Sequence, residues 1–312
     1  MNALVTGAAG FIGSTLAERL VDRGADVLGI DSFADYYPRS VKERNLARLA
    51  HHPRFRLIEA RLQDADLPRL LSDRSHVFHL AAQAGVRKSW GRDFGVYLAN
   101  NIEATQVLLE ACAGRSIERV VYASSSSVYG DTTAMPMRED ALPQPVSPYG
   151  VTKLAAEQLC HLYHVNNGIP TVSLRYFTVY GPRQRPDMGF HKFLRATLLG
   201  QPVTVFGDGG QTRDFTFVDD AVSATIAAAT RGVAGRVYNI GGGSRVSIDH
   251  VLDLIGSVSG RRPTVVLDGE QKGDMRHTLA DTTLARTDLA FTPQVGLRDG
   301  LEAELRWLTE QL

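Results

Sequence analysis

The sequence predicts an α/β protein in which a doubly wound parallel sheet precedes a smaller α/β domain. Two observations predict this fold class. Short apolar runs alternate with amphipathic helical stretches through the first half of the chain, and a glycine-rich turn joins the first apolar run to the first helical stretch. Parallel strands need crossover helices between them, and those helices bury both faces of the sheet.

The alternation is regular up to residue 175. The expected strands are Ala3–Thr6, Asp26–Ile30, Phe55–Ile58, Val77–Leu80, Arg119–Ala123 and Thr171–Arg175. Helical periodicity between them is clearest at Phe11–Arg23, Val96–Ala113 and Tyr149–Asn167. We expect residues 1–175 to form one nucleotide-binding domain.

The pattern loosens after Tyr176, where Gly, Pro and Arg become denser. Strands are expected at Val203–Phe206, Phe215–Val218 and Val237–Ile240, and helices near Phe190–Leu199, Asp219–Thr230, Ile248–Ser257 and Leu301–Leu312. We expect residues 176–312 to form mainly a substrate domain over the carboxyl ends of the strands. Roughly residues 219–240 are expected to return to the first domain.

The composition argues against several classes of partner. The 312 residues include 34 Lys plus Arg and 34 Asp plus Glu, so no overall field attracts nucleic acid or an anionic membrane. A binding site for an anionic small molecule needs only a few local arginines, so the balanced charge does not exclude such a ligand. No charged leader precedes the first strand and no apolar run reaches membrane-spanning length, so we expect a cytoplasmic protein.

No metal site is expected. The two cysteines, Cys112 and Cys160, lie far apart and outside any CxxC pair, which is typical of reduced, buried thiols. His161 and His164 share a helix face, but no cysteine or carboxylate cluster accompanies them.

The glycine-rich turn predicts a dinucleotide site of the Rossmann type. Gly7 permits a tight turn, Gly10 lets the backbone approach a pyrophosphate, and Gly13 allows close packing of the helix. The helix that follows presents free N–H groups, including those of Phe11 and Ile12, and a partial positive charge to the phosphates.

A carboxylate at the end of the second strand favours NAD over NADP. Asp31 is placed to accept the ribose hydroxyls of the adenosine half and to repel a 2′-phosphate. Ser32, beside it, does not change that preference.

Tyr149 and Lys153 form the candidate catalytic pair. Their spacing places them one helical turn apart on one face of a helix. A free tyrosine has a pKa of about 10, and we expect the ammonium and a positively charged nicotinamide to lower it. The serines that begin at Ser124 follow the fifth strand, where their hydroxyls are expected to reach a bound substrate.

Together these motifs resemble the extended short-chain dehydrogenase/reductase family of nucleotide-sugar enzymes. The resemblance rests on the glycine turn, His79–Ala82, the Val128-Tyr-Gly130 segment, and the Tyr149/Lys153 pair. It extends to Arg175–Pro182, Val205–Gly209 and Arg213–Asp220, and so covers nearly the whole chain.

The resemblance implies a set of site residues. The catalytic residues would be Tyr149, Lys153 and Ser125. The cofactor would be held by Gly7, Gly10, Phe11, Ile12, Gly13, Asp31, Ser32, Leu80, Ala81, Ala82, Asn101, Tyr149, Lys153 and Tyr176. The substrate would be held by Gln83, Arg87, Ser126, Ser127, Thr178, Arg185, Val205, Arg213 and Arg276. It further implies a homodimer, formed through helices such as Val96–Ala113 and Tyr149–Asn167.

Two positions depart from the wider family. Arg61 stands where the family usually has an aspartate near the adenine, which puts that contact in doubt. Thr178 stands where many members have an asparagine near the diphosphate.

Three segments resemble those of UDP-glucuronate 4-epimerases. They are Asp35-Tyr-Tyr-Pro38 with Lys42 and Arg44, Ala82–Arg87, and Arg175–Met188. Thr178 agrees with this subgroup. A glucuronate has a carboxylate that glucose lacks, and a guanidinium such as that of Arg185 or Arg87 could bind it.

The sequence therefore predicts NAD-dependent epimerisation at carbon 4 of a UDP-sugar, most consistently UDP-glucuronate to UDP-galacturonate through a 4-keto intermediate. A UDP-glucuronate decarboxylase is the main alternative, although Ser127 stands where related decarboxylases have an acidic residue. A neutral UDP-glucose-type epimerase and a non-enzymatic NAD-sensing module are the others; such modules commonly lose the tyrosine or the lysine.

Overall fold

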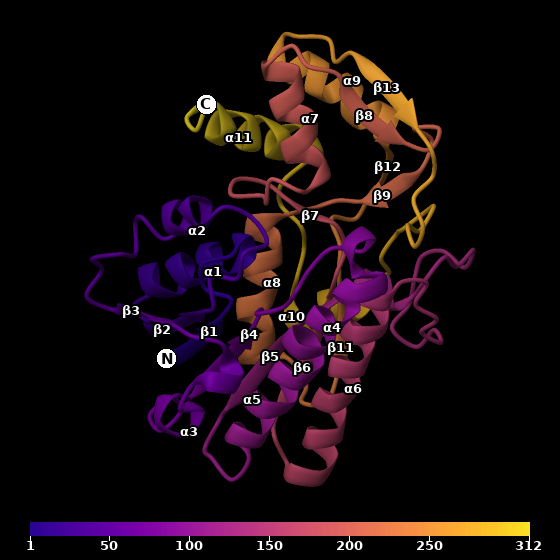
Figure 1. Cartoon of the computed structure of the whole chain (residues 1–312). Coiled ribbons are helices and arrows are strands. Elements are labelled where there is room, and N and C mark those ends of the chain that lie inside the picture. Colours follow the sequence, from indigo (N-terminus) through magenta and orange to yellow (C-terminus); the bar gives the residue numbers. More distant parts are fainter.

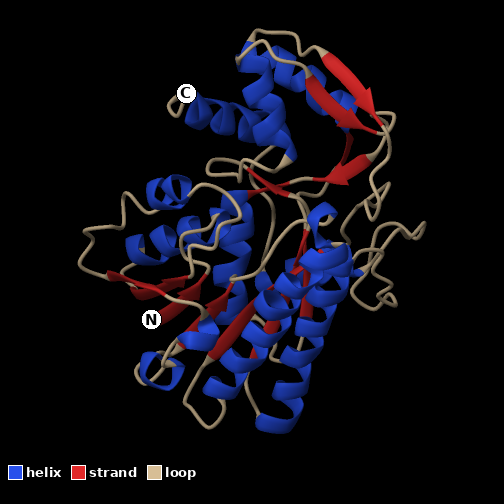
Figure 2. Cartoon of the chain, in the orientation of Figure 1, coloured by secondary structure: helices blue, strands red, loops and turns tan.

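The computed structural model describes all residues, 1–312. Its centre is a seven-stranded sheet whose strands all run parallel, in the order β11-β6-β5-β4-β1-β2-β3. The strands are β1 (Asn2–Thr6), β2 (Asp26–Asp31), β3 (Phe55–Glu59), β4 (His76–His79), β5 (Arg119–Ser125), β6 (Thr171–Tyr176) and β11 (Val237–Ile240). The predicted fold class is therefore confirmed (Figures 1 and 2).

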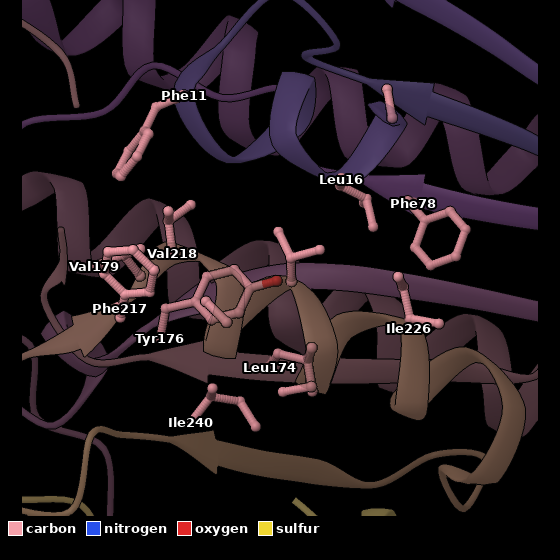
Figure 3. Close-up of a cluster of buried hydrophobic side chains, with 14 of the residues drawn as sticks. Phe11, Leu16, Phe78, Leu174, Tyr176, Val179, Phe217, Val218, Ile226 and Ile240 are labelled. Carbon is pink, nitrogen blue, oxygen red and sulfur yellow. The ribbon is translucent and has the colours of Figure 1, made fainter. Parts of the chain in front are cut away.

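Helices cover both faces of this sheet. One face packs against α1 (Phe11–Asp22) and α8 (Val218–Arg231), and the other against α5 (Ala104–Cys112) and α6 (Pro148–Asn167). Successive residues of β1 point to opposite faces, so Ala3 and Val5 join one core and Leu4 joins the other. Figure 3 shows the first core, where Phe78 and Leu174 of the sheet approach Ile226 of α8.

A smaller layer lies over the carboxyl ends of the sheet strands, at the top of Figure 1. It contains α7 (Gly189–Leu198), α9 (Ile248–Ser259), α11 (Leu297–Thr309) and three two-stranded sheets. Those sheets pair β7 (Val179–Tyr180) with β10 (Thr216–Phe217), β8 (Val203–Phe206) with β13 (Val265–Asp268), and β9 (Thr212–Asp214) with β12 (Arg245–Ser247). None of the helices in the protein has the length and apolar character that a membrane crossing requires.

The chain crosses between these two parts more than once. Strand β11 lies beside β6, and α10 (Thr283–Leu289) packs against α8 and β11. Residues beyond 240 therefore also contact the large sheet. The division at residue 175, with 219–240 returning, stays a prediction.

Several elements differ from the sequence expectation. The Val96–Ala113 helix is interrupted: α4 (Phe94–Tyr97) and α5 flank a π-helical turn at Leu98–Glu103. This turn contains the buried Asn101, whose amide exchanges hydrogen bonds with the backbone of Gln83 at 2.7 and 3.0 Å. Helical periodicity cannot predict this interruption, because the hydrogen bonds of Asn101 are made with a residue outside the helix. π-helical turns are frequent at functional sites. The short helices α2 (Arg39–Asn45) and α3 (Leu67–Leu70) and the exposed strand β13 were not expected.

A buried ion pair joins α6 to the sheet. Glu157 accepts two hydrogen bonds from the Arg175 guanidinium, at 2.6 and 3.1 Å, and one from the Ser124 hydroxyl at 2.6 Å. The two charged side chains are 2% and 3% exposed. Arg175 also stacks 4.6 Å from the ring centre of Tyr129, whose hydroxyl donates to Asn239 at 2.7 Å. One charge cluster therefore fixes α6, β5, β6 and β11 relative to one another.

We expect Arg175→Met to lower the free energy of unfolding by about 3–5 kcal/mol, because it leaves the Glu157 carboxylate buried and uncompensated. Urea denaturation measures this. Arg138→Met is the matched control, since the Arg138 side chain is 64% exposed and its pairs with Asp140 and Asp281 should contribute about 1 kcal/mol or less. A loss in Arg175→Met no larger than the control's would contradict the argument.

Candidate active site

A cleft runs along the carboxyl ends of the sheet strands, where ligands of open α/β sheets bind. It is lined by residues from the carboxyl ends of β1 to β6 and from the turns that follow them. Many predicted residues line it together: Gly7, Gly10, Phe11, Ile12, Gly13, Asp31, Ser32, Leu80, Ala81, Ala82, Gln83, Tyr149, Lys153, Tyr176 and Arg185. Arg61 lines it as well, beside Leu62 at the end of β3.

The glycine turn fits a diphosphate. Gly7 has a φ of +69°, and a Cβ there would lie 2.8 Å from the Ala81 backbone nitrogen. A Cβ on Gly13 would lie 2.1 Å from the Gly7 carbonyl oxygen, so its absence lets α1 press against the turn. Helix α1 begins with no side-chain cap and no acidic residue in its first turn. Its first N–H groups therefore remain free for an anion.

The adenosine end of the cleft has a feature that the sequence argument missed. Asp31 accepts hydrogen bonds from the Ala9 and Phe33 backbone N–H groups at 3.1 and 2.8 Å, and from the Lys42 ammonium at 3.1 Å. Lys42 also lines the cleft. The carboxylate thus has three protein donors, which leaves less room for both ribose hydroxyls than expected, and a cation offsets part of its charge.

Tyr149 and Lys153 line the cleft from the first turns of α6, so the residue at which this helix begins decides their position. The Ser147 hydroxyl caps the helix by accepting the Gly150 N–H at 3.1 Å, and Pro148 occupies its first turn. Gly168, with a φ of +69°, ends it. The Tyr97 ring meets the Tyr149 ring edge to face, with centroids 6.3 Å apart.

The electrostatics of this pair differ from the expectation. Burial raises the pKa of Tyr149, and the Ser125 hydroxyl and the Arg185 charge only partly oppose it. Burial also lowers the pKa of Lys153 to about 7, and its ammonium lies 4.6 Å from the centre of the Tyr122 ring. The expected lowering of the tyrosine pKa considered charges alone, and in the protein by itself desolvation is the larger effect.

The serine turn lies beside this pair. Ser125 ends β5 and accepts the Ser127 N–H at 3.1 Å, while Ser124 both lines the cleft and binds Glu157. Ser126 and Ser127 follow in a short 3₁₀ turn. Tyr176 reaches the cleft from β6, and its hydroxyl bonds Thr225 of α8 at 2.6 Å. Asn101 stands just behind the cleft, bonded to Gln83 and to Thr152.

The two candidate carboxylate-binding arginines have different surroundings. Arg185 lines the cleft with Tyr149 and donates from Nε and Nη2 to Asp187, both at 2.9 Å. Asp187 also accepts from the Tyr36 hydroxyl at 3.3 Å. Arg87, by contrast, pairs with Asp274 at 2.7 Å and stacks 4.0 Å from the Phe206 ring centre.

Two further predicted substrate residues, Arg213 and Arg276, lie near Arg87. Arg213 donates to the Arg276 carbonyl at 3.0 Å, and Arg276 pairs with Asp208 at 2.7 Å. Burial lowers the pKa of Arg213. Val205 is buried in β8, and the Thr178 carbonyl accepts the Thr216 N–H where β7 meets β10. These residues do not line the main cleft, so the structure separates an arginine-rich group from the Tyr149 end.

Sequence reasoning missed the acidic partners of these arginines. Asp274 had no role in it, and Asp187, Tyr36 and Lys42 entered only as part of matching segments. The Arg185-Pro-Asp187 spacing was a usable signal for a local ion pair, whereas the Arg87–Asp274 pair joins residues too distant in the chain to be inferred.

Comparison with known proteins agrees with this arrangement. Residues 3–241 match the model of the NAD dependent epimerase/dehydratase family. The chain is 47% identical to the Bacillus subtilis protein named Uncharacterized UDP-glucose epimerase YtcB, covering 99% of this chain and 98% of that one. It is 35% identical to the UDP-glucuronate 4-epimerase of Thermodesulfobacterium geofontis, covering 99% and 96%. A crystal structure of UDP-glucuronic acid 4-epimerase from Bacillus cereus, in complex with UDP-glucuronic acid and NAD, superposes with a TM-score of 0.97 at 46% identity over 100% of both chains.

Proposed function

The chain belongs to the NAD dependent epimerase/dehydratase family, and we propose that it interconverts UDP-glucuronate and UDP-galacturonate by epimerisation at carbon 4 of the sugar. The observation on which this mainly rests is the position of Arg185. It lines the cleft with Tyr149, and its charge acts on that phenol.

The position of Arg185 matters because of where the substrate differs from a neutral sugar. The carboxylate of a glucuronate is attached to carbon 5, next to the carbon whose hydroxyl must lose a proton to Tyr149. A cation that binds this carboxylate must therefore lie near Tyr149. Asp187 occupies the Nε side of Arg185, and the Nη1 group stays available for a second carboxylate. Arg87, held by Asp274 against Phe206, suits the diphosphate end.

The protein's part in the chemistry is to move one proton and hold the sugar. Tyr149 accepts the proton of the 4-hydroxyl while Ser125 supports the transfer. NAD, when bound, would supply the hydride acceptor, and loss of the proton together with the hydride leaves a ketone at carbon 4. Tyr149 returns the proton after the sugar has turned, so the opposite configuration forms and the cofactor is unchanged overall.

The 4-keto intermediate is a β-keto acid, so loss of carbon dioxide competes with epimerisation. Ser127, the position at which related decarboxylases have an acid, offers only a hydroxyl, and its backbone N–H is bonded to Ser125. This supports plain epimerisation over decarboxylation. The relative named as a UDP-glucose epimerase keeps the neutral sugar as the second candidate.

We also propose that the protein is a cytoplasmic homodimer. Val151, Leu162 and Val165 on α6 are 46%, 51% and 64% exposed, and an exposed apolar helix face favours pairing with a second copy. Both cysteines are free and buried, as is typical of reducing compartments.

We expect NAD to copurify with the protein, because each turnover regenerates it and its release is unnecessary. Heat denaturation followed by chromatography of the released nucleotide measures this. Protein that yields no nicotinamide nucleotide and needs added NADP would contradict the role of Asp31.

We expect Tyr149→Phe to reduce turnover of UDP-glucuronate by about 10²-fold or more while binding is retained, because the base is lost. Lys153→Met should be comparably damaging, since the phenolate loses its nearby cation. Steady-state rates and calorimetric binding of UDP-glucuronate separate catalysis from binding. Near-normal turnover in Tyr149→Phe would exclude the mechanism.

We expect Arg185→Ala to discriminate between substrates. A charged hydrogen bond contributes roughly 1.5–3 kcal/mol. Use of UDP-glucuronate should therefore fall by about 10- to 200-fold, and binding of UDP-glucose should change much less. Catalytic efficiency or affinity for both sugars measures the ratio. Equal losses for both would assign Arg185 to the phosphates and leave Arg87 for the carboxylate.

A further inference from the structure

Arg183 has a backbone conformation that side chains rarely adopt. Its φ is +71°, and only Phe33 and Ala290 share a positive φ among the non-glycine residues. Residues held in such conformations persist where their surroundings fix them, and they gather at functional sites. Arg183 lies two residues before Arg185, in the turn that follows β7.

Contacts of the Arg183 side chain with α1 hold its backbone in this conformation. Its Nη2 donates to Glu18 at 2.7 Å, and its Nη1 donates to the Ser14 hydroxyl at 3.4 Å. The Arg183 and Glu18 side chains are only 17% and 11% exposed. Ser14 and Glu18 are one turn apart on α1, the helix whose first turn faces the cofactor cleft. The left-handed backbone therefore directs this arginine away from the sugar and onto the cofactor helix.

The other contacts of the loop belong mostly to the smaller layer. The Gly181 N–H donates to Glu304 of α11 at 2.8 Å, and the Gln184 side chain accepts the His191 N–H of α7 at 2.8 Å. Without Arg183, the hydrogen bonds from this loop to the large sheet's side would reduce to the one that the Tyr36 hydroxyl donates to Asp187 at 3.3 Å, and the Arg185 guanidinium would still lie 5.7 Å from the centre of the Tyr36 ring. Hydride transfer requires the sugar and the cofactor to be held at a fixed separation.

We propose that Arg183 is a positioning residue: its ion pair with Glu18 ties the loop that contains Arg185 to helix α1, and so sets where the sugar lies relative to the cofactor. The inference rests on the proposed function, because it takes this loop to contact the sugar. Arg183 itself is not among the residues that line the cleft.

The chain offers a matched control. Arg48 donates to the other oxygen of Glu18 at 3.2 Å, but it follows α2 and its side chain is 69% exposed. Removing either Arg48 or Arg183 takes one arginine partner from the Glu18 carboxylate. Only the removal of Arg183 also breaks a contact between the loop and α1. Lys is the conservative replacement at 183, because it keeps the charge for Glu18 and loses the Ser14 contact.

The test compares R183A, R183K, R183G and R48A as NAD-loaded enzymes. We expect R183A to raise the KM for UDP-glucuronate about tenfold, with kcat changed less than threefold and NAD content unchanged. R183K should recover most of the loss and R48A should match the wild type. Glycine at position 183 adopts the positive φ without strain and also lacks the ion pair. A KM in R183G as high as that in R183A therefore assigns the rise in KM to the lost ion pair. Wild-type behaviour of R183G would assign it to strain and overturn the proposal.

Hydrogen exchange of peptides covering residues 177–190 gives a readout that does not depend on the substrate. We expect faster exchange there in R183A than in R48A, while peptides of the central sheet exchange equally in the two variants. Equal exchange, or equal KM shifts in R183A and R48A, would overturn the inference. A wild-type enzyme that does not turn over UDP-glucuronate would instead overturn the proposed function, and the exchange comparison would still decide whether Arg183 holds the loop.

Discussion

The arrangement of the active site depends on the buried ion pair between Glu157 and Arg175. Burying two charges is costly, and the pair is tolerated because three hydrogen bonds satisfy the carboxylate and the guanidinium also stacks on Tyr129. It lies one helical turn beyond Lys153 on the same face of α6, and Ser124 joins it from β5. This charge cluster thereby fixes the segments that hold Tyr149, Lys153 and Ser125 relative to one another.

Burial also governs the chemistry above that cluster. The same desolvation that makes the ion pair costly raises the pKa of Tyr149 and lowers that of Lys153 to about 7. A tyrosine that is protonated in the protein alone needs additional positive charge before it can act as a base. Arg185 supplies part of that charge, and the nicotinamide of a bound cofactor would supply more. Cofactor occupancy and base strength are therefore linked.

Under the proposed function, the arginines divide the substrate site into two chemically different ends. Arg87, Arg213 and Arg276 gather with Asp208 and Asp274, and this group suits a diphosphate that would compete with those carboxylates. Arg185 stands apart beside Tyr149 with its own aspartate. An arginine paired in advance has a fixed orientation, so less conformational entropy is lost when a ligand binds.

The sequence by itself determined the features that depend on neighbours in the chain. The alternation of strands and helices, the glycine turn, Asp31 after β2, and the Tyr149/Lys153 spacing all follow from short-range geometry, and each lies where the pattern predicts. Tertiary structure alone decided that Arg185, not Arg87, stands beside Tyr149, and that Lys153 lies against Tyr122. It also paired Arg183 with Glu18, 165 residues away. The physical reason is that burial and ion pairing depend on which distant segments pack together, and local periodicity does not encode that.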